Sequence, residues 1–132
     1  MVTFTARGHP EVRASHPTTL EFTKETRLTR HGDCIVAVGA DFDADALREL
    51  AKQGGTLVVT IVAEEYKEII TGQANPNFND MQEVVIRLGE FSSGRTLMVR
   101  ADKAATHLNR LLVEKLKNPA TTVVVTVEKA IE

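Results

Sequence analysis

The second half of this chain repeats the pattern of its first half. The stretch VGAD at residues 38–41 recurs as VRAD at residues 99–102, at an offset of 61. Farther along, TLVVTI at residues 56–61 matches TVVVTV at residues 122–127, at an offset of 66. An offset that changes only across the intervening segment is typical of a duplicated unit whose second copy has a longer helix. We therefore predict two similar units, at about residues 1–65 and 66–132, within one domain.

The composition indicates a core that is mainly aliphatic. Hydrophobic residues make up 42% of the chain, but aromatic residues only 5%, and there is no tryptophan. Valine and isoleucine fit a pleated, half-buried surface, so a core built on them favours strands. A chain of 132 residues is long enough to bury such a core without disulfide bonds.

Hydrophobic alternation predicts most of the strands. Residues 2–7 and 83–88 alternate apolar and polar side chains, which is the pattern of a half-buried strand. Residues 12–23 alternate as well, and Pro17 places that strand at an edge or at a bulge. The other expected strands are 34–38, 56–63, 66–71, 96–100 and 121–129, with a turn at 30–33.

A helix is expected at the equivalent place in each half. Asp43 is the expected N-cap of the first helix, with Asp41 as the competing cap, and Gly54 ends it. Asp102 is the expected N-cap of the second helix, which reaches about Lys117. Short turns between most strands favour antiparallel pairing. We predict an α+β fold: a β-rich antiparallel sandwich or barrel-like sheet with two helices, and the order strand–strand–strand–helix–strand in each half.

Side chains capable of acid–base chemistry gather in the first third of the chain. His9, His16, Glu21 and Asp33 are candidate catalytic residues, and the two histidines are candidate metal ligands, although their spacing matches no standard metal motif. Each residue also has a structural interpretation. His9 would be a turn residue, His16 a hydrogen-bonded core histidine, Glu21 a solvated or ion-paired carboxylate, and Asp33 a side chain that closes a turn.

Three neighbouring residues are candidates for ligand binding. Thr18 and Thr19 supply hydroxyls, and Cys34 supplies a thiol. The structural alternatives are strand propensity for the threonines and an inert, small hydrophobic side chain for the cysteine. Cys34 is the single cysteine, so no internal disulfide is possible, and a reducing compartment, the cytoplasm, is the simplest expectation.

Charge and hydropathy argue against some partners. The formal net charge of −2 gives no overall attraction to nucleic acid or to an acidic membrane, although a local basic patch stays open. Residues 1–7 alternate in polarity and so do not resemble a signal peptide. The apolar runs are far shorter than the ~20 residues needed to span a bilayer. We expect no membrane partner.

A second candidate site lies at the expected start of the second helix. Arg95 and Lys103 flank Asp102 in sequence. Cations beside a helix N-terminus can hold an anion such as a phosphate or a carboxylate. The alternative is that Asp102 acts only as an N-cap, which stabilises a helix by ~1 kcal/mol.

Two blocks of the sequence resemble the signature of a known family. The first block is residues 8–23 (GHPEVRASHPTTLEFT) with residues 28–35 (LTRHGDCI), and the second is residues 95–105 (RTLMVRADKAA). They are similar to a small, mostly archaeal family described as domain of unknown function 371, and the resemblance spans nearly the whole chain. It implies a β-rich, sandwich-like fold. It implies no activity, cofactor or catalytic residue.

These observations favour a soluble cytoplasmic domain that binds a small molecule or an anion at a polar site in its first third. A metal-dependent or acid–base hydrolase, using His9 or His16 with Glu21 or Asp33, is one alternative. An RNA-binding module that uses the slightly basic N-terminal third is another. A third is a structural assembly module that forms a homo-oligomer through an edge strand. The sequence names neither a cofactor nor a reaction.

Overall fold

The order of strands and α-helices is the same in the two halves of the chain, and the second half adds a short 3₁₀ helix. The computed structural model describes residues 1–28 and 32–131, so part of the turn predicted at 30–33 lies outside the described residues. The first half contains strands β1 (Val2–Arg7), β2 (Thr19–Thr23) and β3 (Ile35–Ala37), helix α1 (Ala44–Lys52) and strand β4 (Thr56–Ala63). The second half contains strands β5 (Tyr66–Ala74), β6 (Glu83–Arg87) and β7 (Thr96–Val99), the 3₁₀ helix η1 (Ala105–His107), helix α2 (Arg110–Leu116) and strand β8 (Thr122–Lys129).

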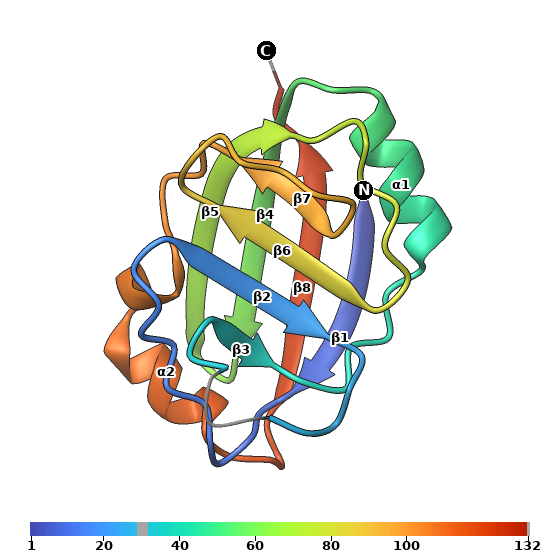
Figure 1. Ribbon diagram of the computed structural model, residues 1–132. Coiled ribbons are helices and arrows are strands. Elements are labelled where there is room, and N and C mark those ends of the chain that lie inside the picture. The colour runs from blue at the N-terminus through green and yellow to red at the C-terminus, as the bar shows by residue number, and fades with distance from the viewer. Residues whose placement is uncertain (29–31, 132) are drawn as a thin grey trace.

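The strands of the described residues form a mixed sheet in the order β1-β8-β4-β5-β7-β6-β2-β3. The backbones of Arg7, at the end of β1, and Val38, just after β3, exchange hydrogen bonds of 2.7 and 2.8 Å. These bonds join the two edges of the sheet. In Figure 1, β7, β6, β2 and β3 lie in front of β5, β4, β8 and β1, with α1 and α2 at opposite sides. The predicted barrel-like α+β architecture is confirmed.

The pairing is less uniformly antiparallel than the sequence predicted. Most neighbours in the sheet are antiparallel, but β2 runs parallel to β3, and β6 runs parallel to β7. Parallel strands cannot be joined by a tight hairpin, and the chain between β6 and β7 makes a longer connection through Phe91 and Gly94. The register shifts in both parallel pairs, between Glu21 and Phe22 in one and between Val85 and Ile86 in the other.

An aspartate fastens a long strand in each half. The backbone N–H of Asp41 donates to the Thr5 carbonyl at 3.0 Å, and its carboxylate accepts from the Thr5 N–H at 2.7 Å and hydroxyl at 2.8 Å. Asp102 repeats the arrangement on Thr71, at 2.9 Å for its own N–H and 3.0 Å for its carboxylate. The bonds from Thr5 hold the pKa of Asp41 below its usual range. The repeated aspartate thus links the helix-side loop to β1 or β5.

The second helix starts later than predicted, and Asp102 is not its N-cap. The helix α2 begins at Arg110, and the side chain of Asn109 accepts a hydrogen bond from a backbone N–H in its first turn. The carboxylate of Asp102 accepts the Thr71 N–H of β5 instead, and the next helical segment, η1, has Ala104 at its N-cap position. The first helix follows the prediction, because the Asp43 side chain caps it by accepting a backbone N–H at 3.1 Å.

The strand predicted over residues 12–23 is confined to Thr19–Thr23. Before it the backbone is irregular, and the fully buried Ala14 has a φ of 48°. The N–H groups of Ser15 and His16 both donate to the Asp33 carbonyl, at 3.0 and 3.2 Å. Between residues 12 and 18, the alternating apolar side chains are buried one by one against the barrel, but the backbone does not pair as a strand.

The core is aliphatic, as expected, but phenylalanines lie at its centre. The Phe4 ring packs edge-on against Phe22 and Phe42, with centroid distances of 5.6 Å to each. Aromatic pairs of this geometry add about 0.5–1.5 kcal/mol beyond the area they bury. The three rings come from β1, β2 and the segment before α1, so they tie the front and back layers of the sheet together.

Gly72 lies where β5 passes close to the end of β7 and the residues just after it. A Cβ at this position would lie 2.9 Å from the Cα of Ala101 and 3.0 Å from the carbonyl oxygen of Val99. We expect Gly72→Ala to lower the free energy of unfolding by about 1–3 kcal/mol, because backbone must move to admit the methyl group. Gly89→Ala is the matched control, since nothing lies within 4 Å of its Cβ position. Equal urea midpoints for the two variants would contradict the close approach.

Candidate functional site

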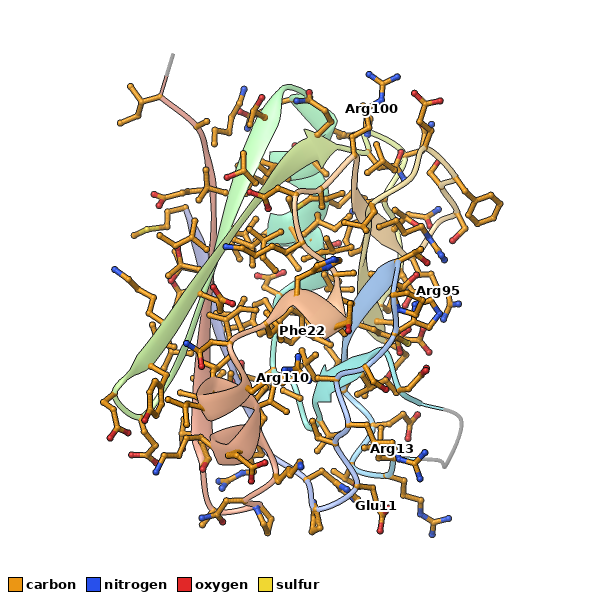
Figure 2. The ribbon with its side chains drawn as sticks, turned by 90° about the vertical axis from the view of Figure 1, so that its left-hand side faces the viewer. Glu11, Arg13, Phe22, Arg95, Arg100 and Arg110 are labelled. Atoms are coloured by element: carbon orange, nitrogen blue, oxygen red, sulfur yellow. The ribbon has the colours of Figure 1, made fainter. Side chains whose placement is uncertain are left out.

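Polar side chains gather on the outward face of β2 and β6. Alternate residues of the two strands enter the core, so Thr19 and Glu21 of β2 and Glu83 and Arg87 of β6 face outward. In the antiparallel register Thr19 lies opposite Arg87, and Glu21 lies opposite Val85. Figure 2 shows Phe22 in the interior and Arg95 on this outer side. The strand register therefore gathers hydroxyl, carboxylate and guanidinium groups on one surface.

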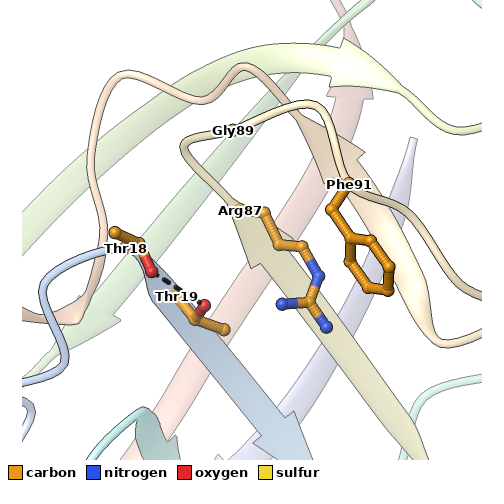
Figure 3. A pocket seen from close by; sticks show the side chains of 5 residues that line it. All are labelled: Thr18, Thr19, Arg87, Gly89 and Phe91. Atoms are coloured by element: carbon orange, nitrogen blue, oxygen red, sulfur yellow. Dashed lines mark hydrogen bonds between the residues drawn. The ribbon is translucent and has the colours of Figure 1, made fainter.

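A pocket of about 260 Å³ opens at one end of this face. It is lined by Thr18, Thr19, Arg87, Gly89 and Phe91. The two threonine hydroxyls are 3.5 Å apart, and Figure 3 shows the Arg87 side chain between them and the Phe91 ring. Hydroxyls, a guanidinium and an aromatic ring thus line the same small space.

The Arg87 guanidinium is held in place on its inner side. Its Nε donates to the Oγ1 of Thr96 at 3.1 Å, and Thr96 is fully buried. Its Cζ lies 5.0 Å from the centroid of the Phe91 ring. Among residues 1–28 and 32–131, its terminal nitrogens have no hydrogen-bond or ion-pair partner. Phe91 is 68% exposed, so its ring is available for further contacts.

The second arginine of this face is occupied by carboxylates. The Arg95 Nη1 lies 2.6 Å from the Glu83 Oε2 and 3.4 Å from the Glu21 Oε1. The hydrogen bond to Glu83 raises the pKa of the guanidinium further. Arg95 was a candidate for anion binding, but its charge is already balanced by these two groups.

Glu21 is a buried carboxyl with an unusual acidity. Its side chain is 7% exposed. Burial, followed by repulsion from Glu83, raises its pKa from 4.5 to about 7, although Arg95 and Arg87 partly oppose the rise. Both the acid and the carboxylate are therefore populated near neutral pH, as a proton-transfer group requires.

Cys34 lies next to Glu21 but is not activated. Its carbonyl accepts the Glu21 N–H at 2.9 Å. Burial of the thiol, together with the negative charges of Glu21 and Asp33, raises its pKa to about 11. Because the thiolate is the nucleophilic form, this environment favours the inert interpretation of Cys34.

His16 organises the threonines of the pocket. Its Nδ1 accepts the backbone N–H groups of Thr18 and Thr19, at 3.2 and 3.0 Å. The interpretation of His16 as a core histidine is wrong, because the residue is only half-buried. Its backbone N–H donates to the carbonyl of Asp33, so these two residues are neighbours. Among the sequence candidates, the structure brings together His16, Thr18, Thr19, Glu21, Asp33, Cys34 and Arg95.

The other candidates lie elsewhere. The His9 N–H donates to the Leu116 carbonyl at the end of α2, and its Nδ1 accepts the N–H of Glu11. The Lys103 Nζ donates to the carbonyl of Ile69 on β5 at 2.7 Å. The anion site predicted at the start of the second helix is not formed, because α2 begins several residues after Asp102.

Sequence reasoning missed Arg87 and Phe91. Arg87 is the last polar-face residue of the alternating stretch 83–88, and it precedes Gly89. Phe91 is an aromatic residue in a turn rich in serine and glycine, where no core is expected. A charged residue at the end of a strand, followed by an aromatic residue in a turn, could have indicated a binding site here.

Within residues 1–28 and 32–131, no group of three or more histidine, cysteine, aspartate or glutamate side chains is placed to hold a metal ion. Over the same residues, no helix has the length and apolar character needed to cross a membrane.

The protein is a small barrel-like α+β domain with a pocket on its outer face. Residues 4–130 match the family model described as "Domain of unknown function (DUF371)". The chain is also 37% identical over 118 residues to the uncharacterized protein MJ0206 of Methanocaldococcus jannaschii, with 85% of this chain and 87% of that protein covered. The chain belongs to the DUF371 family, as its signature blocks indicated. The family description names no activity.

The buried Glu21 carboxyl predicts a distinctive pH dependence of stability. Its pKa is higher in the folded protein than in the unfolded chain, so folding takes up a proton between about pH 4.5 and 7. The stability contribution is full below pH 4.5, falls as pH rises, and is lost above pH 7. A rise from 4.5 to about 7 corresponds to about 3 kcal/mol.

We therefore compare the free energy of unfolding of Glu21→Gln with that of the wild type. Because only the wild type loses stability as pH rises, the difference should shift in favour of the variant by about 3 kcal/mol between pH 4.5 and pH 7.5. Urea unfolding at several pH values measures the difference. Glu11→Gln, at an exposed position at the lower end of Figure 2, is the matched control and should track the wild type. A difference between Glu21→Gln and wild type that stays constant with pH would show that the carboxyl is not perturbed.

Proposed function

We propose that this protein binds a small organic anion in the pocket between the end of β6 and the start of β2. The proposal depends on the position and the available hydrogen-bond donors of Arg87. Its guanidinium is anchored by Thr96 and lies against Phe91, and its terminal nitrogens have no partner among the described residues. A positioned guanidinium pairs with a carboxylate or a phosphate through two parallel hydrogen bonds.

The remaining lining residues fit such a ligand. The hydroxyls of Thr18 and Thr19 can donate to further oxygens of the anion. The exposed ring of Phe91 offers an apolar face to a flat, carbon-rich part of the ligand. A volume of about 260 Å³ is slightly below the usual range for drug-sized ligands, so a compact ligand is favoured.

Arg95 supports the proposal by contrast. It lies on the same outward face as Arg87, but Glu21 and Glu83 already balance its charge. An added anion would have to displace these carboxylates from Arg95, whereas at Arg87 it would displace only water. A cytoplasmic location is part of the proposal and is supported by Cys34, the single cysteine.

Arg87→Gln is the first test. We expect it to weaken binding of benzoate and of inorganic phosphate at least about tenfold, because it removes a charge-assisted hydrogen-bond donor. NMR titration of the full chain at low salt measures the affinities. Arg48→Gln on α1 is the matched control, since it makes the same charge change on a helix and should leave binding intact. Equal affinity in wild type and Arg87→Gln, or no binding of either probe, would overturn the proposal.

Phe91→Ala separates the apolar contact from the charge. We expect it to weaken benzoate binding by about two- to tenfold, because the ring loses its stacking partner, and to leave acetate binding unchanged. The ring is 68% exposed, so the variant should fold normally. An equal loss for benzoate and acetate would mean that Phe91 acts only by positioning Arg87.

Binding of a single-stranded RNA through Arg87, with a steep salt dependence, would instead favour the RNA-binding alternative.

A further inference from the structure

Glu21 and the pocket share one surface. Thr19 lines the pocket, and Glu21 follows two residues later on the same face of β2. On the neighbouring strand, Arg87 lies opposite Thr19. The positive charge of Arg87 acts on the Glu21 carboxyl, which has little water around it to screen the interaction.

Arg87 is the cation near Glu21 whose charge an added anion can neutralise. Arg95 is closer to Glu83 than to Glu21, by 2.6 against 3.4 Å, so its charge is shared. Arg87 has no carboxylate partner among residues 1–28 and 32–131. Within the described part of the chain, the charged and titratable groups around Glu21 and Cys34 are Glu83 and Arg87 from β6, Arg95 before β7, Asp33 before β3, and Asp80 before β6.

We propose, as an extension of the binding function above, that Glu21 takes up a proton from solvent when an anion binds to Arg87. The anion neutralises the Arg87 guanidinium, whose positive charge favours the carboxylate form of Glu21. A larger fraction of Glu21 is then in its protonated form. The net reaction is the binding of one anion together with part of one proton. No bond other than the O–H bond of Glu21 forms, and the proton comes from the buffer.

The burial of Glu21 sets the pH range in which this coupling acts. Its pKa of about 7 leaves the carboxyl partly ionised near neutral pH, so there is charge to lose when the ligand arrives. Coupling between two sites is reciprocal. If the anion promotes protonation, protonation promotes anion binding, and the affinity rises as pH falls through neutrality. The protein would then hold its ligand more tightly in mildly acidic than in mildly alkaline conditions.

Calorimetry with benzoate tests the coupling directly. At pH 7 in two buffers of different ionisation enthalpy, the wild type should show net proton uptake per benzoate bound. Its affinity should weaken by about fivefold or more between pH 6 and pH 8.5, which is the low end of coupling between two sites. Glu21→Gln should bind benzoate with no proton uptake and a flat pH profile. Glu11→Gln should behave as the wild type does.

A second measurement needs no ligand. Carbon NMR of the Glu21 carboxyl should show that it titrates at higher pH in Arg87→Gln than in the wild type, because the variant removes the same charge that an anion neutralises. An unchanged Glu21 titration in Arg87→Gln would overturn the coupling. Benzoate binding that depends on Arg87 but takes up no proton would also overturn it while leaving the proposed function standing. A wild type that binds no benzoate would overturn both.

Discussion

The register between β2 and β6 is the constraint on which the rest of the site depends. It places Thr19 opposite Arg87 and keeps the polar set of both strands outside while Leu20 and Ile86 enter the core. A slip of one residue would send that whole set inward, where unpaired charges are costly. The closed sheet protects this register, because neither β2 nor β6 is a free edge that could re-pair.

At the site, the two halves of the chain have equivalent strand pairings but different residues. Glu21 pairs with Ile35 in the parallel β2–β3 pair, and Val85 pairs with Thr96 in the parallel β6–β7 pair, so Glu21 and Val85 hold equivalent places. The two also lie opposite each other across the β2–β6 pair. One half supplies a carboxyl where the other supplies a valine. The repeated fold gives a stable scaffold, and its differences supply the chemistry.

Much of the fold could be predicted from the sequence, because alternation and repetition report directly on strands and on their order. The start of the second helix could not: Asp102 looks like an N-cap, and only the tertiary contact with Thr71 shows its role. The candidates His16, Thr18 and Glu21 lie near one another because they are close along the chain, and their functional roles stay predictions. Arg87 was missed because it reaches them through strand pairing across more than sixty residues, and a single sequence does not show such pairing.

The central claim is that Arg87 is a positioned guanidinium open to an anion. The NMR signal of its Nε–H group tests this most directly, because that group is bonded to the buried Thr96. We predict that the signal is protected from exchange in the free protein and shifts in a saturable way when benzoate is added. A signal that exchanges freely with water, or one that stays unmoved while benzoate shifts residues elsewhere, would contradict it.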